Sequence, residues 1–393
     1  MAVPPNSTAE LRYPYDAHPA PGTTIEVAPG VRWLSMPMGG SLNHINLYLL
    51  EDDAGWYVVD TGLHNEEVER LWHTLFQGDM GGRPVLGVIC THMHPDHTGQ
   101  AAMITEHFQC PLLMTQLEFL HTRMMVGGGG GPSHMLNWQG RRHFQRAGMD
   151  MSFFAQMEAM WQARMEEARQ KADATAQPGS GGGPMGMPFP ASYQRLVDGQ
   201  ILQIGGNEWQ VLVGAGHSPE HACLYCRQLG VLISGDQILP VITSNVSVQP
   251  TEPEANPLRI WLDAHDRFLG VLPPETFVLP AHNLPFYGVR ERLRQLIVHH
   301  EDRMLAVEEA CAESPRTAAE LLPVLFRREL EPMQKMMALG EAIAHLNLLR
   351  HRYRLERELG EDGVYRYHSI DPTLPRRLNP KEHEDPEDAP MFI

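Results

Sequence analysis

Short runs of apolar residues, each closed by polar turn residues, recur through the first 300 positions and predict a β-rich α/β fold. Residues 31–34, 46–50 and 56–60 are typical of strands joined by hairpins. Residues 64–77 differ, because their apolar side chains recur three and four positions apart, which predicts an amphipathic helix. We expect its buried face to hold Val68, Leu71, Trp72 and Leu75.

Four apolar runs further along the chain end in a histidine or an aspartate. These runs and the polar residues that follow them are 84–90 with His92, 208–213 with His217, 230–234 with Asp236, and 276–279 with His282. Functional sites in layered α/β folds gather where strands end, so we expect the four loops to meet at one edge.

The first of these loops, residues 91–99, carries a dense cluster of candidate metal-binding side chains. His92, His94, Asp96 and His97 fall within six residues, and Thr98 is the expected cap of a helix that follows. Imidazole and carboxylate groups in such density favour Zn²⁺ over Mg²⁺ or Ca²⁺, which prefer oxygen ligands. The pattern predicts a metal site.

Seven side chains are enough ligands for two ions that each keep an open position, which is typical of a catalytic rather than a structural site. The expected ligands are His92, His94 and His217 for one ion, Asp96, His97 and His282 for the other, and Asp236 as a bridge between them. We expect Asp96 and Asp236 to be the catalytic carboxylates.

Two further residues are expected to support the ligands rather than bind metal. His221 lies four positions after His217 and is the expected hydrogen-bonding partner of a ligand, although it competes for a ligand role. Asp60 is expected to orient a ligand loop through hydrogen bonds. The alternative for Asp60 is a simple turn cap before Thr61 and Gly62.

The order and setting of the seven ligands resemble the metallo-β-lactamase superfamily over residues 25–300, apart from an insertion. The resemblance implies an αββα sandwich with a dinuclear site at one edge of its two sheets, and a metal-bridging hydroxide as nucleophile. Members that use iron for redox chemistry can carry Glu at the second motif position, so His94 favours zinc and hydrolysis. Zinc β-lactamases carry Cys at the bridging position and are exported, so Asp236 is closer to glyoxalase II-like hydrolases. We expect two Zn²⁺ ions, while mixed iron–zinc or manganese loading stays open.

The amino-acid composition limits the kinds of partner that we expect the protein to bind. The formal charge of −17 argues against broad electrostatic capture of nucleic acid or of an anionic membrane. No signal-peptide pattern and no membrane-spanning apolar run is visible, and the five cysteines are scattered, so we expect a cytoplasmic protein. Cys223 and Cys226 lie in an alternating pattern that favours a strand over a redox motif. A homodimer stays open.

Residues 122–195 are predicted to form a helical insertion flanked by glycine, with glycine tracts at 127–131 and 179–183. Residues 151–174 of the insertion have a helical pattern and carry Met151, Met157, Met160 and Met165. The insertion could act as a lid over an apolar substrate, because methionine adapts to irregular surfaces. We favour the alternative, in which it packs on the domain or on a second subunit.

Helices and then a short hairpin are predicted for residues 301–370, which resembles the winged-helix domain appended to some of these hydrolases. Ser314 and Pro315 are the expected start of one helix. A winged helix can bind nucleic acid, but residues 313–370 carry nine basic and nine acidic side chains, so we favour packing. Residues 1–24 are rich in proline, and residues 371–393 are an expected acidic disordered tail.

The leading hypothesis is hydrolysis of a small ester-type substrate, most simply a thioester and next a lactone. The alternative is a phosphodiesterase or endoribonuclease that uses the same metal pair, with the winged helix contacting nucleic acid. A third possibility is a metal-bearing regulatory protein that has lost activity, against which the complete ligand set argues.

Overall fold

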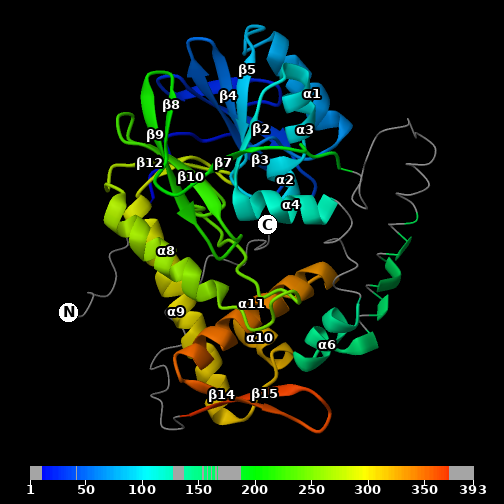
Figure 1. The fold of residues 1–393 in the computed structure, drawn as a ribbon. Helices are drawn as coiled ribbons and strands as arrows, with labels where there is room; N and C mark the ends of the chain where they lie inside the picture. The colour runs from blue at the N-terminus through cyan, green and yellow to red at the C-terminus, as the bar shows by residue number, and fades with distance from the viewer. Residues whose placement is uncertain are drawn as a thin grey trace.

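The computed structural model describes most of the chain. The described residues are 11–40, 42–126, 137–152, 155, 156, 158–160, 162, 163, 166 and 187–370. They form two β-sheets, helices on the outer face of each sheet, and a C-terminal group of helices with a separate hairpin (Figure 1).

The first sheet has seven strands in sequential order. They are β1 (Thr24–Ala28), β2 (Val31–Pro37), β3 (His44–Asp52), β4 (Gly55–Val59), β5 (Val85–Ile89), β6 (Leu112–Thr115) and β7 (Gln194–Leu196). The predicted hairpins are confirmed, because β2, β3 and β4 pair antiparallel. Strands β4 to β7 then run parallel.

The second sheet has six strands in the order β13-β12-β11-β10-β9-β8. They are β8 (Ile201–Ile204), β9 (Asn207–Gly214), β10 (His221–Cys226), β11 (Val231–Gly235), β12 (Phe277–Pro280) and β13 (Phe286–Tyr287). The expected strand around Cys223 and Cys226 is β10, and both cysteines are buried free thiols.

Three apolar layers hold these elements together. The layer between the sheets includes Trp33 from the first sheet and Trp209 from the second. Trp72 lies in the layer under α1 (Glu66–Gln77) and α3 (Ala101–Phe108), and Trp261 in the layer under α8 (Pro257–Val271) and α9 (Val289–Glu313). The order helix, sheet, sheet, helix is the predicted αββα sandwich. Burying such large side chains is the main stabilising contribution.

The helix after β4 is confirmed with a shifted start. It begins at Glu66 after Asn65, whose side chain accepts from the Val68 amide. The expected cap at Thr98 is wrong. Thr98 lies inside the short helix α2 (Pro95–Thr98), and its hydroxyl donates to the His94 carbonyl instead.

The C-terminal region continues from α9 through η1 (Ala319–Leu321), α10 (Leu322–Leu325) and α11 (Pro332–His351) to the hairpin of β14 (Leu355–Leu359) and β15 (Tyr365–Ser369). The expected helix start at Ser314 is wrong, because Ser314 is extended and ends α9. Arg316 then pairs with Tyr367, and Thr317 caps the turn of η1. The predicted domain boundary at residue 300 falls inside α9.

The predicted insertion is described only in part, including the end of α4 (Gln116–Val126), α6 (Trp138–Arg146) and β7. Both glycine tracts, Met157 and Met165 lie outside the described residues, while Met151 and Met160 are exposed. In the part of the chain that the structure describes, no helix is both long enough and apolar enough to cross a membrane.

Candidate metal centre

Loops from both sheets bring the seven predicted ligands together. The loop after β5 carries His92 and His94, and α2 carries Asp96 and His97 on one turn that begins at Pro95. The second sheet supplies the other three ligands, at the ends of β9, β11 and β12. These are His217, Asp236 and His282.

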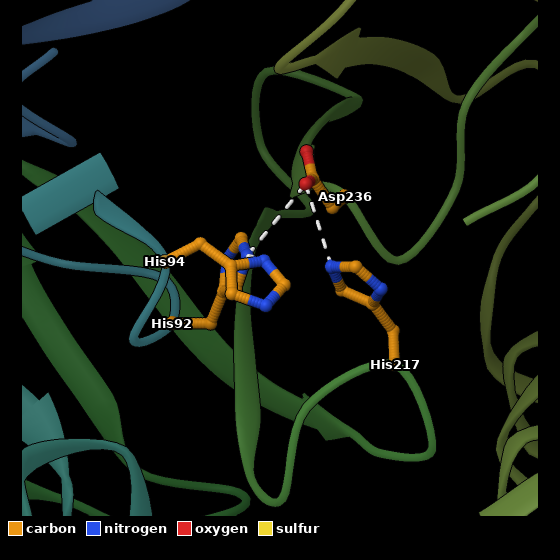
Figure 2. Close-up of side chains that lie close together, drawn as sticks. All are labelled: His92, His94, His217 and Asp236. Carbon is orange, nitrogen blue, oxygen red and sulfur yellow. Dashed lines mark hydrogen bonds and ion pairs between the residues drawn. The ribbon is translucent and has the colours of Figure 1, made fainter. Parts of the chain in front are cut away.

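The ligand atoms fall into two groups, within each of which they lie no more than 4.8 Å apart. The first ligand group is His92, His94, His217 and Asp236, and the second ligand group is Asp96, His97 and His282. Figure 2 shows the first group, in which one carboxylate oxygen of Asp236 faces His92 and His217.

Asp236 also reaches the second group. Its Oδ2 lies 3.5 Å from His217 Nε2 and 3.4 Å from His97 Nε2, and its Oδ1 lies 3.5 Å from His282 Nε2. Asp96 Oδ2 lies 3.3 Å from His97 Nε2 and 3.5 Å from His282 Nε2. The Asp236 carboxylate therefore sits between the groups, as a bridging ligand would.

The spacing of these atoms fits ligands around a shared ion. Two ligands each about 2.1 Å from a tetrahedral ion lie about 3.4 Å from one another. Among the described residues, the buried polar atoms without a hydrogen-bond partner include Asp96 Oδ2, His97 Nε2, His217 Nε2, His282 Nε2 and both carboxylate oxygens of Asp236. Leaving one such atom unpaired costs about 1–3 kcal/mol, and two cations, one at each ligand group, would satisfy all of them.

The opposite nitrogen of the imidazoles is held by the protein. Nδ1 of His97 lies 2.8 Å from Asp60 Oδ2, and Nδ1 of His217 lies 2.8 Å from the Asn245 carbonyl. Nδ1 of His282 lies 3.1 Å from the His44 carbonyl. Each acceptor fixes the tautomer in which Nδ1 carries the proton and the Nε2 lone pair faces the cluster.

Asp60, which the sequence analysis expects to orient a ligand loop, makes hydrogen bonds to that loop. Besides His97, its carboxylate accepts from the Thr91 amide at 2.7 Å and from the Thr91 hydroxyl at 2.8 Å. Its backbone is left-handed, with φ of 60°, a conformation that a β-branched or bulky residue would strain to adopt.

His221 supports Asp236 from behind. The Asp236 amide donates to His221 Nε2 at 3.1 Å, so this nitrogen is an acceptor and is not free to bind metal. Gly235 permits the approach, because its φ is 51° and a Cβ there would lie 2.5 Å from His221 Cε1.

Comparison with known proteins agrees with this geometry. Residues 40–282 match the model of the metallo-beta-lactamase superfamily, and residues 304–370 match a metallo-beta-lactamase-like C-terminal domain. The chain belongs to the metallo-beta-lactamase superfamily.

Solved structures of this superfamily extend the match to nearly the whole chain. A beta-lactamase domain protein from Burkholderia ambifaria is 41% identical with a TM-score of 0.79, over 91% of this chain and 98% of the other. A metallo-beta-lactamase family protein from Thermus thermophilus is 27% identical with a TM-score of 0.63, over 88% of this chain and all of the other. A curated relative, the probable metallo-hydrolase YqjP of Bacillus subtilis, is 22% identical over 80% of this chain and 91% of its own length. The chain is a metallo-hydrolase of the superfamily whose His/Asp clusters fit a dinuclear metal site.

The sequence analysis missed one residue that supports the site, Glu118 of α4. It is fully buried, and its carboxylate accepts from the Met93 amide at 2.9 Å and from the Glu220 amide at 2.7 Å. It thereby ties the loop of His94 to the loop of His217. The available signal was an acidic side chain within the apolar run 112–119.

The C-terminal helix α11 also reaches the site. The buried side chain of Glu341 accepts from Asn245 Nδ2 at 3.1 Å, and the Asn245 carbonyl faces His217. Gly340 accepts from the Val248 amide through its carbonyl at 3.0 Å, and a Cβ on Gly340 would lie 2.9 Å from Ser247. No local sequence pattern could have revealed this contact, because Asn245 and Glu341 are 96 positions apart.

The two groups differ in proton affinity. Burial, together with the neighbouring His97 and His94, holds the pKa of His92 well below its ordinary value, and burial lowers the pKa of His94 to about 3. Burial also lowers the pKa of His97 and His282, but Asp96 and Asp236 more than offset it and raise both values. The same contacts lower the pKa of Asp96 and Asp236.

Proposed function

We propose that the protein is a zinc-dependent hydrolase that cleaves a small ester-type substrate, either a thioester or a lactone, as glyoxalase II-like enzymes do. The observation that carries the proposal is the set of buried imidazole and carboxylate atoms spaced as ligands of two shared ions. A catalytic zinc site needs such ligands and an open position for substrate.

The donor set favours zinc. His92, His94 and His217 offer three nitrogens to one ion, Asp96, His97 and His282 offer mixed donors to the other, and Asp236 offers one oxygen to each. When bound, the ions supply Lewis-acid polarisation of a carbonyl and a lowered pKa for water.

The chain's own residues would set the orientation of that chemistry. Asp96, within 3.5 Å of both His97 and His282, carries an unpaired oxygen on the side of the second ligand group. Asp60 and the Asn245 carbonyl hold ligand imidazoles in one tautomer, so no reorientation is needed when substrate binds.

A thiolate is the leaving group that best suits the surroundings. His44, whose carbonyl accepts from His282, has its pKa lowered to about 4 by burial and by the neighbouring His18 and His282. It is therefore neutral near pH 7 and is a poor proton donor. A thioester releases a stable thiolate without a strong general acid, which supports a thioester before a lactone.

A nucleic acid substrate is the weaker proposal. The C-terminal helices and hairpin, which we propose to form a winged helix, carry arginines that are already ion-paired. The pairs are Arg350 and Arg357 with Glu254, Arg352 with Glu301, and Arg354 with Glu308. The pairs with Glu254 join the C-terminal region to the loop before α8, and the other two pairs lie within the region, which supports packing as the role of these guanidiniums.

The test combines metal analysis of the purified protein with a hydrolysis screen over thioesters, lactones, a phosphodiester and a short RNA. We expect about two zinc ions per chain and turnover of a thioester or lactone. Asp96→Ala should abolish this turnover. The matched control is Asp263→Ala, which removes an exposed carboxylate paired with Arg259 on α8. Cleavage of RNA or of the phosphodiester alone would overturn the ester proposal. A metal content below about one ion per chain, with no turnover of any substrate, would overturn the proposal that the protein is an enzyme.

A further inference from the structure

A cavity lies between the C-terminal hairpin and α6. Its volume is about 410 Å³, and its walls come from α6, the loop 250–254, α11 and both strands of the hairpin. These elements lie together in the lower part of Figure 1. The cavity shares no residue with either ligand group, and we call it the arginine–aromatic pocket, after Trp138, Arg142, Arg146, Glu254, Arg357 and Tyr365.

The arginine–aromatic pocket is positive in a strongly acidic protein. Arg357 is paired with Glu254 at 2.9 Å, and Glu254 is shared with Arg350 at 3.0 Å. Within the described part of the chain, neither Arg142 nor Arg146 has a carboxylate at ion-pair distance. Among the described residues these two guanidiniums have no carboxylate partner, although the protein has a formal charge of −17, and they would attract an anion.

Planar surfaces line the same pocket. Two guanidiniums lie over the Tyr365 ring, with Arg357 Cζ 4.0 Å and Arg146 Cζ 5.1 Å from its centroid. Trp138 stands one helical turn before Arg142 and is 64% exposed, which leaves its indole open for stacking. A flat ring and a phosphate would find complementary partners side by side here.

We propose that the arginine–aromatic pocket binds a nucleotide. Its phosphate would lie between Arg142 and Arg146, since a guanidinium fork matches phosphate oxygens, and its base would stack on Trp138. The volume is in the range of small-ligand sites and accommodates a single nucleotide rather than a strand. The source is a free nucleotide or a nucleotide group carried on a larger molecule such as coenzyme A.

The test is calorimetric titration of the full chain, as purified and again after metal removal by chelation, with 3′,5′-ADP, coenzyme A, inorganic phosphate and a short single-stranded RNA. We expect saturable binding of 3′,5′-ADP, and equal or tighter binding of coenzyme A if the carrier is the source. Arg142→Ala combined with Arg146→Ala should weaken binding at least about tenfold, which corresponds to losing one charge-assisted phosphate contact. Trp138→Ala should weaken the binding of 3′,5′-ADP and leave the binding of inorganic phosphate unchanged.

The matched control is Arg141→Ala, because Arg141 lies on the same helix and is ion-paired with Glu158. This variant should bind 3′,5′-ADP as the parent does. Arg142→Lys keeps the charge and removes the fork, so intermediate affinity would support the assignment. Binding that survives the double variant, binding that disappears on chelation, or binding of RNA without 3′,5′-ADP would each overturn the proposal. None of these outcomes depends on ester hydrolysis.

Discussion

The two ligand groups are similar in donor type but differ in what stands behind their imidazoles. In the second group His97 donates to a carboxylate, Asp60. In the first group His217 faces a backbone carbonyl, and His92 Nδ1 faces the Thr91 hydroxyl at 3.1 Å. A carboxylate behind an imidazole makes it a stronger base than a neutral acceptor does.

The pKa values of the imidazoles also separate the groups before any metal binds, chiefly because Asp96 and Asp236 lie close to His97 and His282. The pKa values of His97 and His282 are raised, whereas those of His92 and His94 are lowered, chiefly by burial. A metal at the second group must displace protons, whereas His92 and His94 in the first group are already neutral. The dinuclear site thus combines ligand imidazoles of raised pKa with ligand imidazoles of lowered pKa.

Removing the bridge should have the largest effect, because Asp236 faces both groups. We expect Asp236→Ala to bring metal content from about two ions to below about one per chain and to abolish hydrolysis. Asp236→Asn keeps the shape but offers one neutral oxygen, so it should retain one ion. Metal analysis after dialysis measures both. Two retained ions in Asp236→Ala would show that the groups do not share this ligand.

Removing the carboxylate behind His97 should weaken the second group more than the first, which Asp60 reaches only through Thr91. We expect Asp60→Asn to weaken binding of one of the two ions by about 10–100-fold, as loss of a partner behind a ligand does, and to weaken binding of the other ion less. Stepwise titration of the metal-free protein with Zn²⁺ resolves the two affinities. An equal loss in both ions would show that Asp60 supports the fold in general.

Removing Glu341, which lies on the C-terminal helix α11, should weaken metal binding by the first ligand group. Glu341→Ala leaves Asn245 Nδ2 without this acceptor, so the loop that holds His217 becomes less ordered. We expect a loss of affinity below about tenfold for one ion, less than for Asp60→Asn. The absorption spectrum of the Co²⁺-substituted protein reports on the ligand geometry. Glu341→Gln keeps an acceptor oxygen and should restore both the metal affinity and the Co²⁺ spectrum. A failure to restore them would contradict the positioning role of Glu341.

Sequence patterns predicted the parts of this site that follow strand ends. The loop after β5 and the residues Asp236 and His282 could be identified because an apolar run precedes each of them. The supporting residues differ in kind. Asp60 stands at a strand end and was predicted, whereas Glu118 and Glu341 act through contacts with residues far along the chain. Such contacts depend on the packing of helices against loops, which periodicity does not encode.

The same limit explains the wrong helix starts. Thr98 and Ser314 both have the composition of a cap, but a proline-initiated turn includes the first, and α9 extends through Glu313 to end at the second. Tertiary contacts, such as the pairing of Arg316 with Tyr367, outweigh local propensity at these positions.

The smallest expected effect is on the pH dependence of the free energy of unfolding of the metal-free protein. This dependence should have opposite signs for imidazoles of the two ligand groups. His94 has its pKa lowered to about 3, so below about pH 6.5 the unfolded chain binds a proton that the folded protein does not. Its contribution to the free energy of unfolding is lost as pH falls. His282 has a raised pKa, so its contribution is complete below about pH 6.5 and is lost as pH rises through the folded pKa.

Substitution should therefore change opposite limbs of the stability curve. His94→Asn should reduce the slope between about pH 3 and 6.5 by at most about 1.4 kcal/mol per pH unit, and His282→Asn should change only the slope above about pH 6.5. Urea unfolding of the chelated protein over this pH range measures both slopes. If both variants changed the same limb, the imidazoles of the two groups would carry the same charge without metal. The carboxylates of Asp96 and Asp236 would then not raise the pKa of His282 in the metal-free protein.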